Sequence, residues 1–577
     1  MLKTLLAQVK EYKKAAILTP MLVVIEVILE VAIPFLMSMI IDKGINNNDM
    51  DAVIKIGIMM LIASFVSLSA GGLAGKYAAK ASTGFAKNLR KAMYYNIQNF
   101  SFANIDKYST AGLVTRLMTD VTNVQNAFQM IIRMCIRAPL MMIGAMIMAF
   151  TINAELAMIF VVAIIFLGII LAFIMTRAHP LFRKIFRTYD DLNASVQENV
   201  NGIRVVKAYV REEHEDQKFK KTSGLIYKLF LKAESYLVFN QPIMQFTVYG
   251  CIIGISWFGA HMIVGGSLTT GELTSMFTYV MMILMSLMML SMVFVMVVMS
   301  IASAQRISEV INEKSTLHNP TNPEYEIKDG SIDFNNVSFS YFDDQEEVNL
   351  KDINVHIKSG QTIGIIGGTG SAKSTFVQLI PRLYDVTRGE VLVGGKDVRS
   401  YDLDTLRNEV AMVLQKNVLF SGTIKDNLRW GNKNATDEEM IHACKLAQAD
   451  EFIQRFPDKY DTYIEQGGSN VSGGQKQRLC IARALLKKPK ILILDDSTSA
   501  VDTKTDALIR KAFREVIPGT TKIIIAQRIS SVEDADLIIV LDDGKISAMG
   551  TNDELLQTSE IYKDIYETQK KGGSLSE

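Results

Sequence analysis

The sequence has almost no excess charge of either sign and very few cysteines, and each shortage argues against a class of protein. Its 577 residues contain 61 Lys and Arg against 60 Asp and Glu, which gives a formal net charge of +1. Nucleic-acid-binding proteins usually carry a basic face, so we expect no nucleic-acid partner. The cysteines lie far apart, without the spacing of a disulfide framework or a zinc site. We interpret all four as packing residues: Cys135, Cys251, Cys444 and Cys480.

We also expect no cleavable signal peptide. The basic N-terminus, MLKTLLAQVKEYKK, precedes an apolar stretch that is too long for a signal-peptide core and lacks a small-residue cleavage pattern. The chain is longer than one hydrophobic core usually supports, so two or more domains are expected. Long runs of Met, Ile, Leu and Val extend to about Gln305, whereas charged, polar and apolar residues alternate beyond it. This asymmetry predicts a membrane domain followed by a soluble α/β domain.

Six stretches are apolar enough to cross a membrane, which takes roughly 20 residues each. They cover about residues 16–42, 53–77, 128–151, 155–177, 237–263 and 273–300. The two long connections between them, about 78–127 and 178–236, are charged, and the first is rich in Lys and Arg. Because basic loops tend to stay in the cytoplasm, we expect both termini to be cytoplasmic. The lack of a recognisable transit peptide favours a bacterial cell membrane as the location.

Two intramembrane patterns have two interpretations each. Glu26 and Glu30 share one helical face. They either contact substrate or protons, or have a structural role in which they pair with Arg133 or Arg137 or are hydrated near the membrane edge. The last span carries a methionine stripe that suits either adaptable apolar ligands or ordinary packing against helices and lipid. Its members are Met281, Met285, Met288, Met292, Met296 and Met299.

The soluble part opens with a pattern typical of phosphate binding. The strand-like QTIGIIG leads into GGTGSAKST, residues 367–375, and then into a helix-compatible stretch. In this order, backbone N–H groups at a helix start can surround phosphate oxygens. We expect Lys373 to reach the terminal phosphates and Ser374 to give its hydroxyl to Mg²⁺. The other predicted ATP contacts here are Gly367, Gly368, Thr369, Gly370, Ser371, Ala372 and Thr375.

A second apolar run, KILILDD, ends in two carboxylates. A buried strand would deliver Asp495 beside the phosphate loop, where it would hold Mg²⁺. Upstream, the Pro, Asn and Gly residues of HNPTNPEYEIKDG are typical of a linker. We therefore predict a membrane domain over 1–313, a linker over 314–330 and an ATP-binding domain over 331–577.

The segment VSGGQKQRL, from Val471 to Leu479, resembles the signature of the ABC transporter superfamily. Six spans followed by one nucleotide-binding domain resemble an exporter half-transporter over nearly the whole chain. The resemblance implies that Ser472, Gly473, Gly474 and Gln475 contact ATP held by a partner. It also implies that Tyr341 stacks on adenine, that Gln415 contacts Mg²⁺, and that Ser499 and Asp502 belong to a loop crossing between the two nucleotide domains. SFANIDKYSTAGLVTRL and SVQENVNGIRVVKAY resemble the segments that hold the coupling helices.

Three positions of the chain's own ATP site depart from the family pattern. Asp496 stands where a catalytic Glu normally follows the aspartate, Gln527 replaces the switch histidine, and Ala372 replaces the glycine before Lys373. A catalytic group misplaced by about 1 Å can cost roughly a hundredfold in rate. The signature is intact apart from Val471 in place of the usual Leu, and Gln466 replaces a Glu common in the loop before it.

These departures predict an asymmetric heterodimer. The family resemblance implies that it exports drugs or other amphipathic compounds by alternating access. A second, non-identical half-transporter with an intact Glu and His would perform most of the hydrolysis, while this chain binds ATP and Mg²⁺. One alternative is a homodimeric exporter of lipid or peptide. Another is a regulatory ATP-binding membrane protein that transports nothing. The homodimer predicts appreciable ATPase activity of the chain alone, whereas the regulatory protein predicts no substrate-stimulated ATPase activity and no vesicle transport in any pairing.

Overall fold

In the computed structural model, which describes residues 1–341, 348–496 and 501–573, the chain forms two compact units. The first comprises Met1–Gln98 and Thr110–Glu313, and the second comprises Asn99–Ser109 and Lys314–Glu577. A short early segment of the chain therefore belongs to the second unit.

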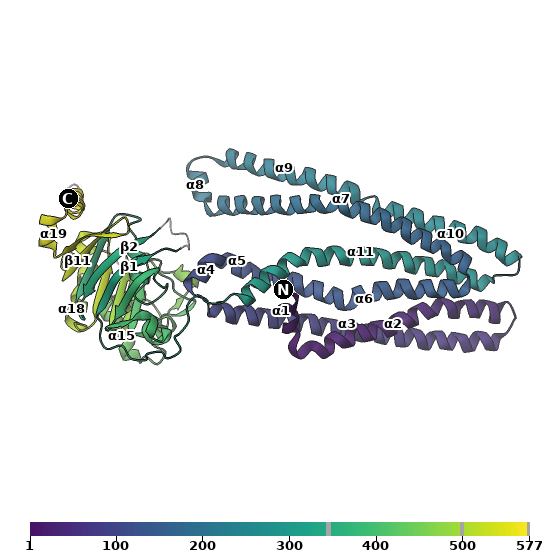
Figure 1. The fold of residues 1–577 in the computed structure, drawn as a ribbon, viewed down its shortest axis with the longest axis horizontal. Coiled ribbons are helices and arrows are strands. Elements are labelled where there is room, and N and C mark those ends of the chain that lie inside the picture. Colours follow the sequence, from purple (N-terminus) through teal and green to yellow (C-terminus); the bar gives the residue numbers. More distant parts are fainter. Residues whose placement is uncertain (342–347, 497–500, 574–577) are drawn as a thin grey trace. The chain divides into compact units, whose positions relative to one another are not determined.

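The first unit consists of long helices, which Figure 1 shows lying lengthwise beside one another. They are α2 (Lys13–Met39), α3 (Met50–Gln98), α6 (Val121–Ile152), α7 (Ala154–Asn201), α9 (Glu212–Leu237), α10 (Asn240–Val264) and α11 (Thr270–Asn312). Its shorter elements are α1 (Leu2–Leu6), η1 (Ala7–Tyr12), η2 (Ile40–Ile45), α5 (Thr110–Thr115), η3 (Arg116–Asp120) and α8 (Ile203–Ala208).

Six helical stretches in the described residues are long and apolar enough to span a membrane, as predicted from the sequence. Their outer faces carry large apolar side chains; Leu61, Phe65 and Leu68 of α3, for example, are 72%, 70% and 73% exposed. Small residues such as Ala74 and Ala78 lie on the buried face of the same helix. This inverse distribution of large and small apolar residues fits a helix bundle surrounded by lipid.

The charged pair predicted in the first span has a partner. Arg137 of α6 forms ion pairs with Glu26 and with Glu30 of α2, the latter at 2.8 Å. The second carboxylate oxygen of Glu26 is buried and has no hydrogen-bond partner among the described residues. The Glu pair therefore ties α2 to α6, in agreement with the pairing interpretation.

The second unit is built on a six-stranded sheet in the order β12-β11-β3-β10-β9-β6, parallel except for its β12 edge. Both faces are buried, as a parallel sheet requires. Its strands are β3 (Thr362–Gly367), β6 (Val410–Val413), β9 (Ile491–Asp495), β10 (Thr521–Ile525), β11 (Leu537–Asp542) and β12 (Lys545–Gly550).

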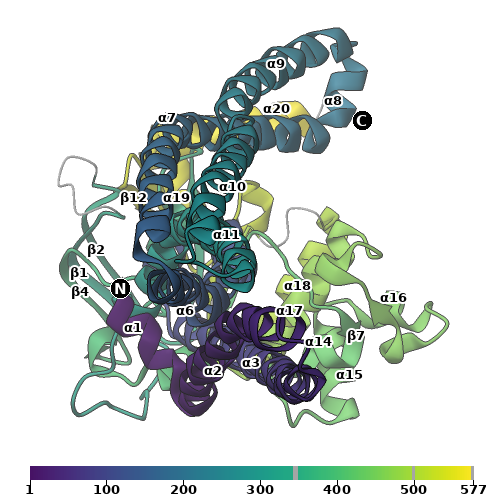
Figure 2. The same ribbon diagram turned by 90° about the vertical axis from the view of Figure 1, so that its right-hand side faces the viewer.

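A four-stranded sheet, β2-β1-β4-β5, covers one face of the parallel sheet. It comprises β1 (Ile332–Phe339), β2 (Leu350–Ile357), β4 (Arg388–Val393) and β5 (Lys396–Asp397), and a separate small pair is formed by β7 (Gly422–Thr423) and β8 (Tyr463–Ile464). In Figure 2, β1, β2 and β4 lie at one side of this unit and α14 to α16 at the other.

Helices cover the opposite face of the parallel sheet. The helices of the second unit are α4 (Phe102–Tyr108), α12 (Lys373–Gln378), α13 (Leu403–Glu409), α14 (Ile424–Arg429), α15 (Asp437–Leu446), α16 (Asp450–Gln454), α17 (Gly473–Leu485), α18 (Thr503–Val516), α19 (Asn552–Thr558) and α20 (Glu560–Gly573). The short 3-10 turns are η4 (Val398–Ser400), η5 (Lys459–Asp461), η6 (Gln466–Gly468) and η7 (Ile529–Ser531).

Candidate functional site

The predicted phosphate loop follows β3 and leads directly into α12, which is the strand, loop and helix order expected from the sequence. A side chain at Gly367 would overlap the carbonyl oxygen of Leu541 on the neighbouring strand. Gly370 has φ +85°, a conformation that glycine adopts readily. A Cβ at Gly368 or Gly370 would meet nothing within 4 Å, so the concave backbone here is open to a ligand.

Ala372 occupies the left-handed region, with φ +68° and ψ +25°, at the N-cap of α12. For an L-residue with a side chain, steric repulsion makes this conformation unfavourable by roughly 1–2 kcal/mol, whereas glycine adopts it without that cost. Ala372, where the family pattern has glycine, therefore introduces strain into the loop.

Lys373 bends back over the loop. Its Nζ donates hydrogen bonds to the carbonyl oxygens of Gly367 and Gly368, at 2.9 and 2.7 Å. Burial lowers the pKa of its amine, while the nearby carboxylates of Asp496 and Asp495 act in the opposite direction. The side chain is thus a half-buried cation held within the loop where phosphates are expected.

Ser374 and Asp495 provide a candidate Mg²⁺ site. The Ser374 hydroxyl donates to Oδ1 of Asp495 at 3.0 Å, so two oxygen ligands converge from α12 and β9. Burial raises the pKa of the Asp495 carboxyl, and the bond from Ser374 opposes that rise. Hydroxyl and carboxylate oxygens are the donors that Mg²⁺ prefers, so the residues present fit the ion.

The two substituted catalytic positions contact each other. Nε2 of Gln527 donates a hydrogen bond to Oδ2 of Asp496 at 2.8 Å, and the side chain of Gln415 also hydrogen-bonds to Asp496. Asp496 directly follows β9 and has φ +47°. Burial raises the pKa of its carboxyl, against the effect of these two hydrogen bonds. The structure therefore brings together three residues that the sequence places 31 or more positions apart.

Tyr341 lies beside the phosphate loop, 38% exposed. Its hydroxyl lies 3.0 Å from the Thr375 hydroxyl, and its ring meets that of Tyr384 edge to face, with centroids 5.1 Å apart. Tyr384 in turn donates to Asp106 of α4 at 2.7 Å. The predicted adenine contact is thus packed against a second tyrosine that binds the segment resembling a coupling helix.

The predicted signature begins α17. The Ser472 hydroxyl accepts from the Gln475 backbone at 3.3 Å, while the Gln475 side chain accepts from the Ser472 backbone at 2.9 Å. This reciprocal capping leaves Ser472 and Gly473 exposed at a helix start. Asp502 caps α18 by accepting from Thr505 at 2.9 Å, and Ser499 lies outside the described residues.

Gln569 is a positioning residue that the sequence interpretation missed. Nε2 of this side chain on α20 donates to the Gln527 carbonyl at 2.7 Å, and its Oε1 accepts from the Ile529 backbone at 2.9 Å. The two bonds fix the loop that carries the switch position. Both partners are backbone groups 40 or more residues away in sequence, so no local pattern marks Gln569.

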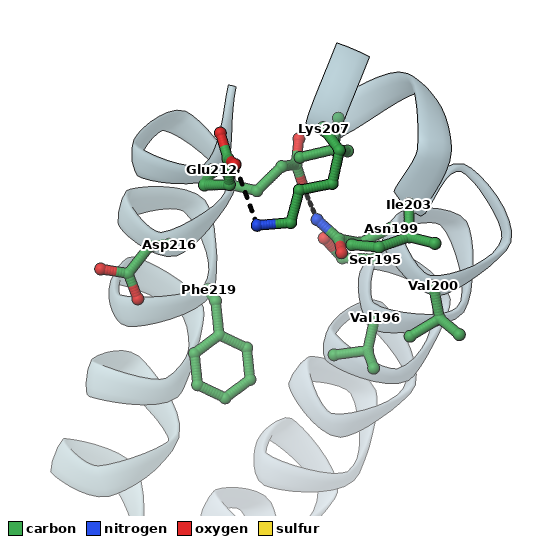
Figure 3. Close-up of a pocket in the computed structure, with 11 residues that line it drawn as sticks. Ser195, Val196, Asn199, Val200, Ile203, Lys207, Glu212, Asp216 and Phe219 are labelled. Carbon is green, nitrogen blue, oxygen red and sulfur yellow. Dashed lines mark hydrogen bonds and ion pairs between the residues drawn. The ribbon is translucent and has the colours of Figure 1, made fainter. Parts of the chain in front are cut away.

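In the first unit, the second segment that resembles a coupling region comprises the last residues of α7 and all of α8, which precedes α9. Lys207 pairs with Glu212 at 2.9 Å, and Asn199 donates to Glu215 at 3.0 Å. Figure 3 shows Phe219 and Val196 pointing into the cleft of about 330 Å³ between the two long helices. An ion pair and a hydrogen bond therefore hold the turn at α8 beside a mostly apolar cleft.

In the described residues, six stretches long and apolar enough to span a membrane are followed in the same chain by an α/β unit with a candidate nucleotide site, which is the domain organisation of membrane transport ATPases. Residues 16–288 match the family model of the ABC transporter transmembrane region, and residues 350–499 match the ABC transporter family model. The chain belongs to the ABC transporter family and is of the half-transporter exporter type. It is a multi-pass membrane protein.

Relatives match over almost their full length. The Bacillus subtilis ABC transporter ATP-binding protein YfiB is 37% identical over 567 residues, which is 98% of each chain. A Staphylococcus aureus protein named as a putative multidrug export ATP-binding/permease protein is 33% identical over 99% of this chain and 100% of its own. The structure of an ATP-bound bacterial Atm1-family ABC exporter superposes with a TM-score of 0.81 at 24% identity, covering 97% of this chain and 98% of that one. The predicted fold is confirmed.

Proposed function

We propose that this chain is one subunit of a heterodimeric ABC exporter and that its own ATP site binds nucleotide but hydrolyses it slowly. ATP-driven export follows from family membership. The proposal adds that the two ATP sites of the exporter differ in hydrolysis and that the partner is a different chain. A second, non-identical half-transporter would supply an intact Glu and His to the site that this chain's signature completes.

The observation that carries the proposal is the environment of Asp496. A catalytic carboxylate at this position must polarise the attacking water, but Asp496 is one methylene shorter than Glu and already accepts hydrogen bonds from Gln527 and Gln415. Gln527 can donate a hydrogen bond but cannot become a cation, so it lacks the charge that a histidine can carry. Both substitutions weaken hydrolysis without removing the phosphate loop.

ATP binding is supported by the open glycine loop, by Lys373, and by the convergence of Ser374 and Asp495. When bound there, Mg²⁺ would neutralise charge on the phosphates. Nucleotide held without rapid turnover would keep the two nucleotide domains together through many cycles at the partner site. ATP shifts the inward-facing and outward-facing states only through its different affinity for them.

For the substrate, we propose drugs or other amphipathic compounds, supported by the name of the Staphylococcus aureus relative. The membrane would be the bacterial plasma membrane, with both termini in the cytoplasm. Two alternatives make different predictions. A homodimeric lipid or peptide exporter predicts brisk ATPase activity from this chain alone, and a regulatory protein predicts no substrate-stimulated ATPase activity in any pairing.

The test is steady-state ATP hydrolysis by the purified chain, alone and together with a candidate partner half-transporter that carries the catalytic Glu. We expect activity only in the pair, lost when the partner's Glu becomes Gln and retained in Asp496→Asn of this chain. Rapid turnover by the lone chain that disappears in Asp496→Asn would refute the asymmetric heterodimer and favour the homodimer.

A further inference from the structure

The first unit contains a cavity of about 490 Å³ bounded by α7, the junction of α9 with α10, and α11. Small-molecule sites in proteins typically measure ~300–1,000 Å³, so this cavity is large enough for a ligand. Five of its lining residues are methionines, one from α7 and four from α11. They are Met175, Met285, Met288, Met289 and Met292.

The methionines of this cavity present surface to a ligand instead of closing a core. Met285 and Met292 are 60% and 64% exposed, although both belong to the stripe that the sequence marks along the last span. A thioether chain is unbranched, flexible and polarisable, so it adapts to apolar bodies of different shape. The lining therefore favours apolar ligands without demanding one shape.

The lack of charged side chains in the described part of the lining further restricts which ligands the cavity can bind. None of the described residues that line the cavity is ionisable. A charged compound entering it would lose hydration without gaining a counter-charge, which is strongly unfavourable. An uncharged compound has no such penalty.

One polar group in the lining lacks a partner. Asn240, the first residue of α10, lines the cavity, and its Oδ1 atom is buried with no hydrogen bond from any described residue. A buried acceptor without a donor is costly, so a ligand that brings an N–H or O–H to this atom gains affinity.

We propose that this cavity binds the transported compound and selects uncharged, mostly apolar molecules that carry a hydrogen-bond donor. The methionines accept the apolar body, and Asn240 fixes its orientation. This inference rests on the export function proposed above and adds the chemical class of the substrate.

The experiment uses methionine oxidation as a local reporter. The full-length chain in lipid nanodiscs, without nucleotide, is treated with dilute hydrogen peroxide, and sulfoxide formation at each methionine is followed by mass spectrometry. The probe is N-phenyl-1-naphthylamine, which is uncharged and has a single N–H. The comparison compound is 1-phenylnaphthalene, which lacks that donor. Met549 of β12, 46% exposed in the second unit, is the internal reference.

We expect the amine to slow oxidation at Met285 and Met292, with no change at Met549. Half-maximal protection should need about tenfold less amine than 1-phenylnaphthalene, the effect of one hydrogen bond. Asn240→Leu should remove that difference, whereas Asn47→Leu, at an exposed position between the first two spans, should keep it.

Three results would overturn the inference: equal protection by both compounds, protection by the amine that is unchanged in Asn240→Leu, or methionines inert to peroxide without any probe. The last would mean that a partner chain or lipid covers the cavity. Because the assay needs no ATP, its result is separable from the ATPase test. An active asymmetric pair without protection removes only this inference, and protection without the predicted ATPase asymmetry removes only the heterodimer proposal.

Discussion

At the scale of single residues, Ala372 holds the phosphate loop in a conformation that favours glycine. We expect Ala372→Gly to stabilise the chain by about 0.5–1 kcal/mol, because relief of left-handed strain exceeds the extra entropy of glycine in the unfolded state. The measurement is the midpoint of thermal unfolding in detergent. Ala372→Ser keeps the Cβ atom and should show no gain, and a lower midpoint for Ala372→Gly would contradict the strain argument.

Asp496 and Gln527 allow a gain-of-function prediction. The double variant Asp496→Glu and Gln527→His should raise hydrolysis at this chain's own site by roughly a hundredfold, because it returns the carboxylate and the cation to their working positions. The assay uses a pair whose partner carries Gln at its catalytic Glu, so that only this site turns over. Asp496→Glu alone should give a smaller gain. Unchanged turnover in the double variant would mean that other features limit the site.

The sequence predicted most of this site because its residues lie in short linear patterns. Lys373, Ser374 and Asp495 were identified from two apolar runs and the residues after them. The bond between Gln527 and Asp496 was not predictable in the same way, since it depends on β9 and β10 being neighbours in the sheet. Tyr384 and Gln569 were missed because their partners are distant in the chain and, for Gln569, are backbone atoms.

At the scale of elements, α20 restrains the loop after β10 through Gln569. We expect Gln569→Ala to speed hydrogen exchange at the Ile529 amide by about tenfold, because that N–H loses its acceptor. Gln569→Glu is the matched control: its carboxylate still accepts from Ile529 but cannot donate to the Gln527 carbonyl. Ile529 should therefore stay protected in that variant. Equal exchange in all three proteins would show that α20 does not hold the loop.

Arg137 holds helices α2 and α6 together through its ion pairs with two carboxylates. Arg137→Met would leave Glu26 and Glu30 without a counter-charge, and we expect a loss of about 3–5 kcal/mol in stability. The loss should appear as a lower thermal midpoint in detergent. Adding Glu26→Gln and Glu30→Gln to that variant should restore most of it. Failure of the triple variant to recover would indicate that Arg137 acts through packing instead.

The six membrane-spanning helices were predicted from the sequence in number and order, but their lengths were not. The sequence marked the second span as about 53–77, whereas α3 runs over Met50–Gln98. Likewise, α7 continues to Asn201, well beyond the predicted span that ends near 177. Hydropathy marks only the part of a helix that lies in lipid, and the polar continuation follows helical geometry without an apolar signal.

At the scale of the whole molecule, one chain contains only half of each proposed ATP site. Gly474 lies in the first turn of α17, where the signature would meet the partner's nucleotide. We expect Gly474→Asp to abolish ATPase activity of the heterodimer, because a carboxylate there would repel the γ-phosphate. Binding of a fluorescent ATP analogue to this chain alone should be unchanged. Full activity of the mutant pair would mean that this signature does not serve the partner's site.

Residues Asn99–Ser109 belong to the second unit but are synthesised long before the rest of it. This segment, which carries Asp106, leaves the ribosome roughly 200 residues before Lys314, where the rest of the unit begins. At translation rates of about 5–20 residues per second, it waits roughly 10–40 s for the strands and helices with which it folds. The second unit therefore cannot be completed by its C-terminal stretch alone. Its folding must bring this early peptide together with strands and helices that are synthesised much later.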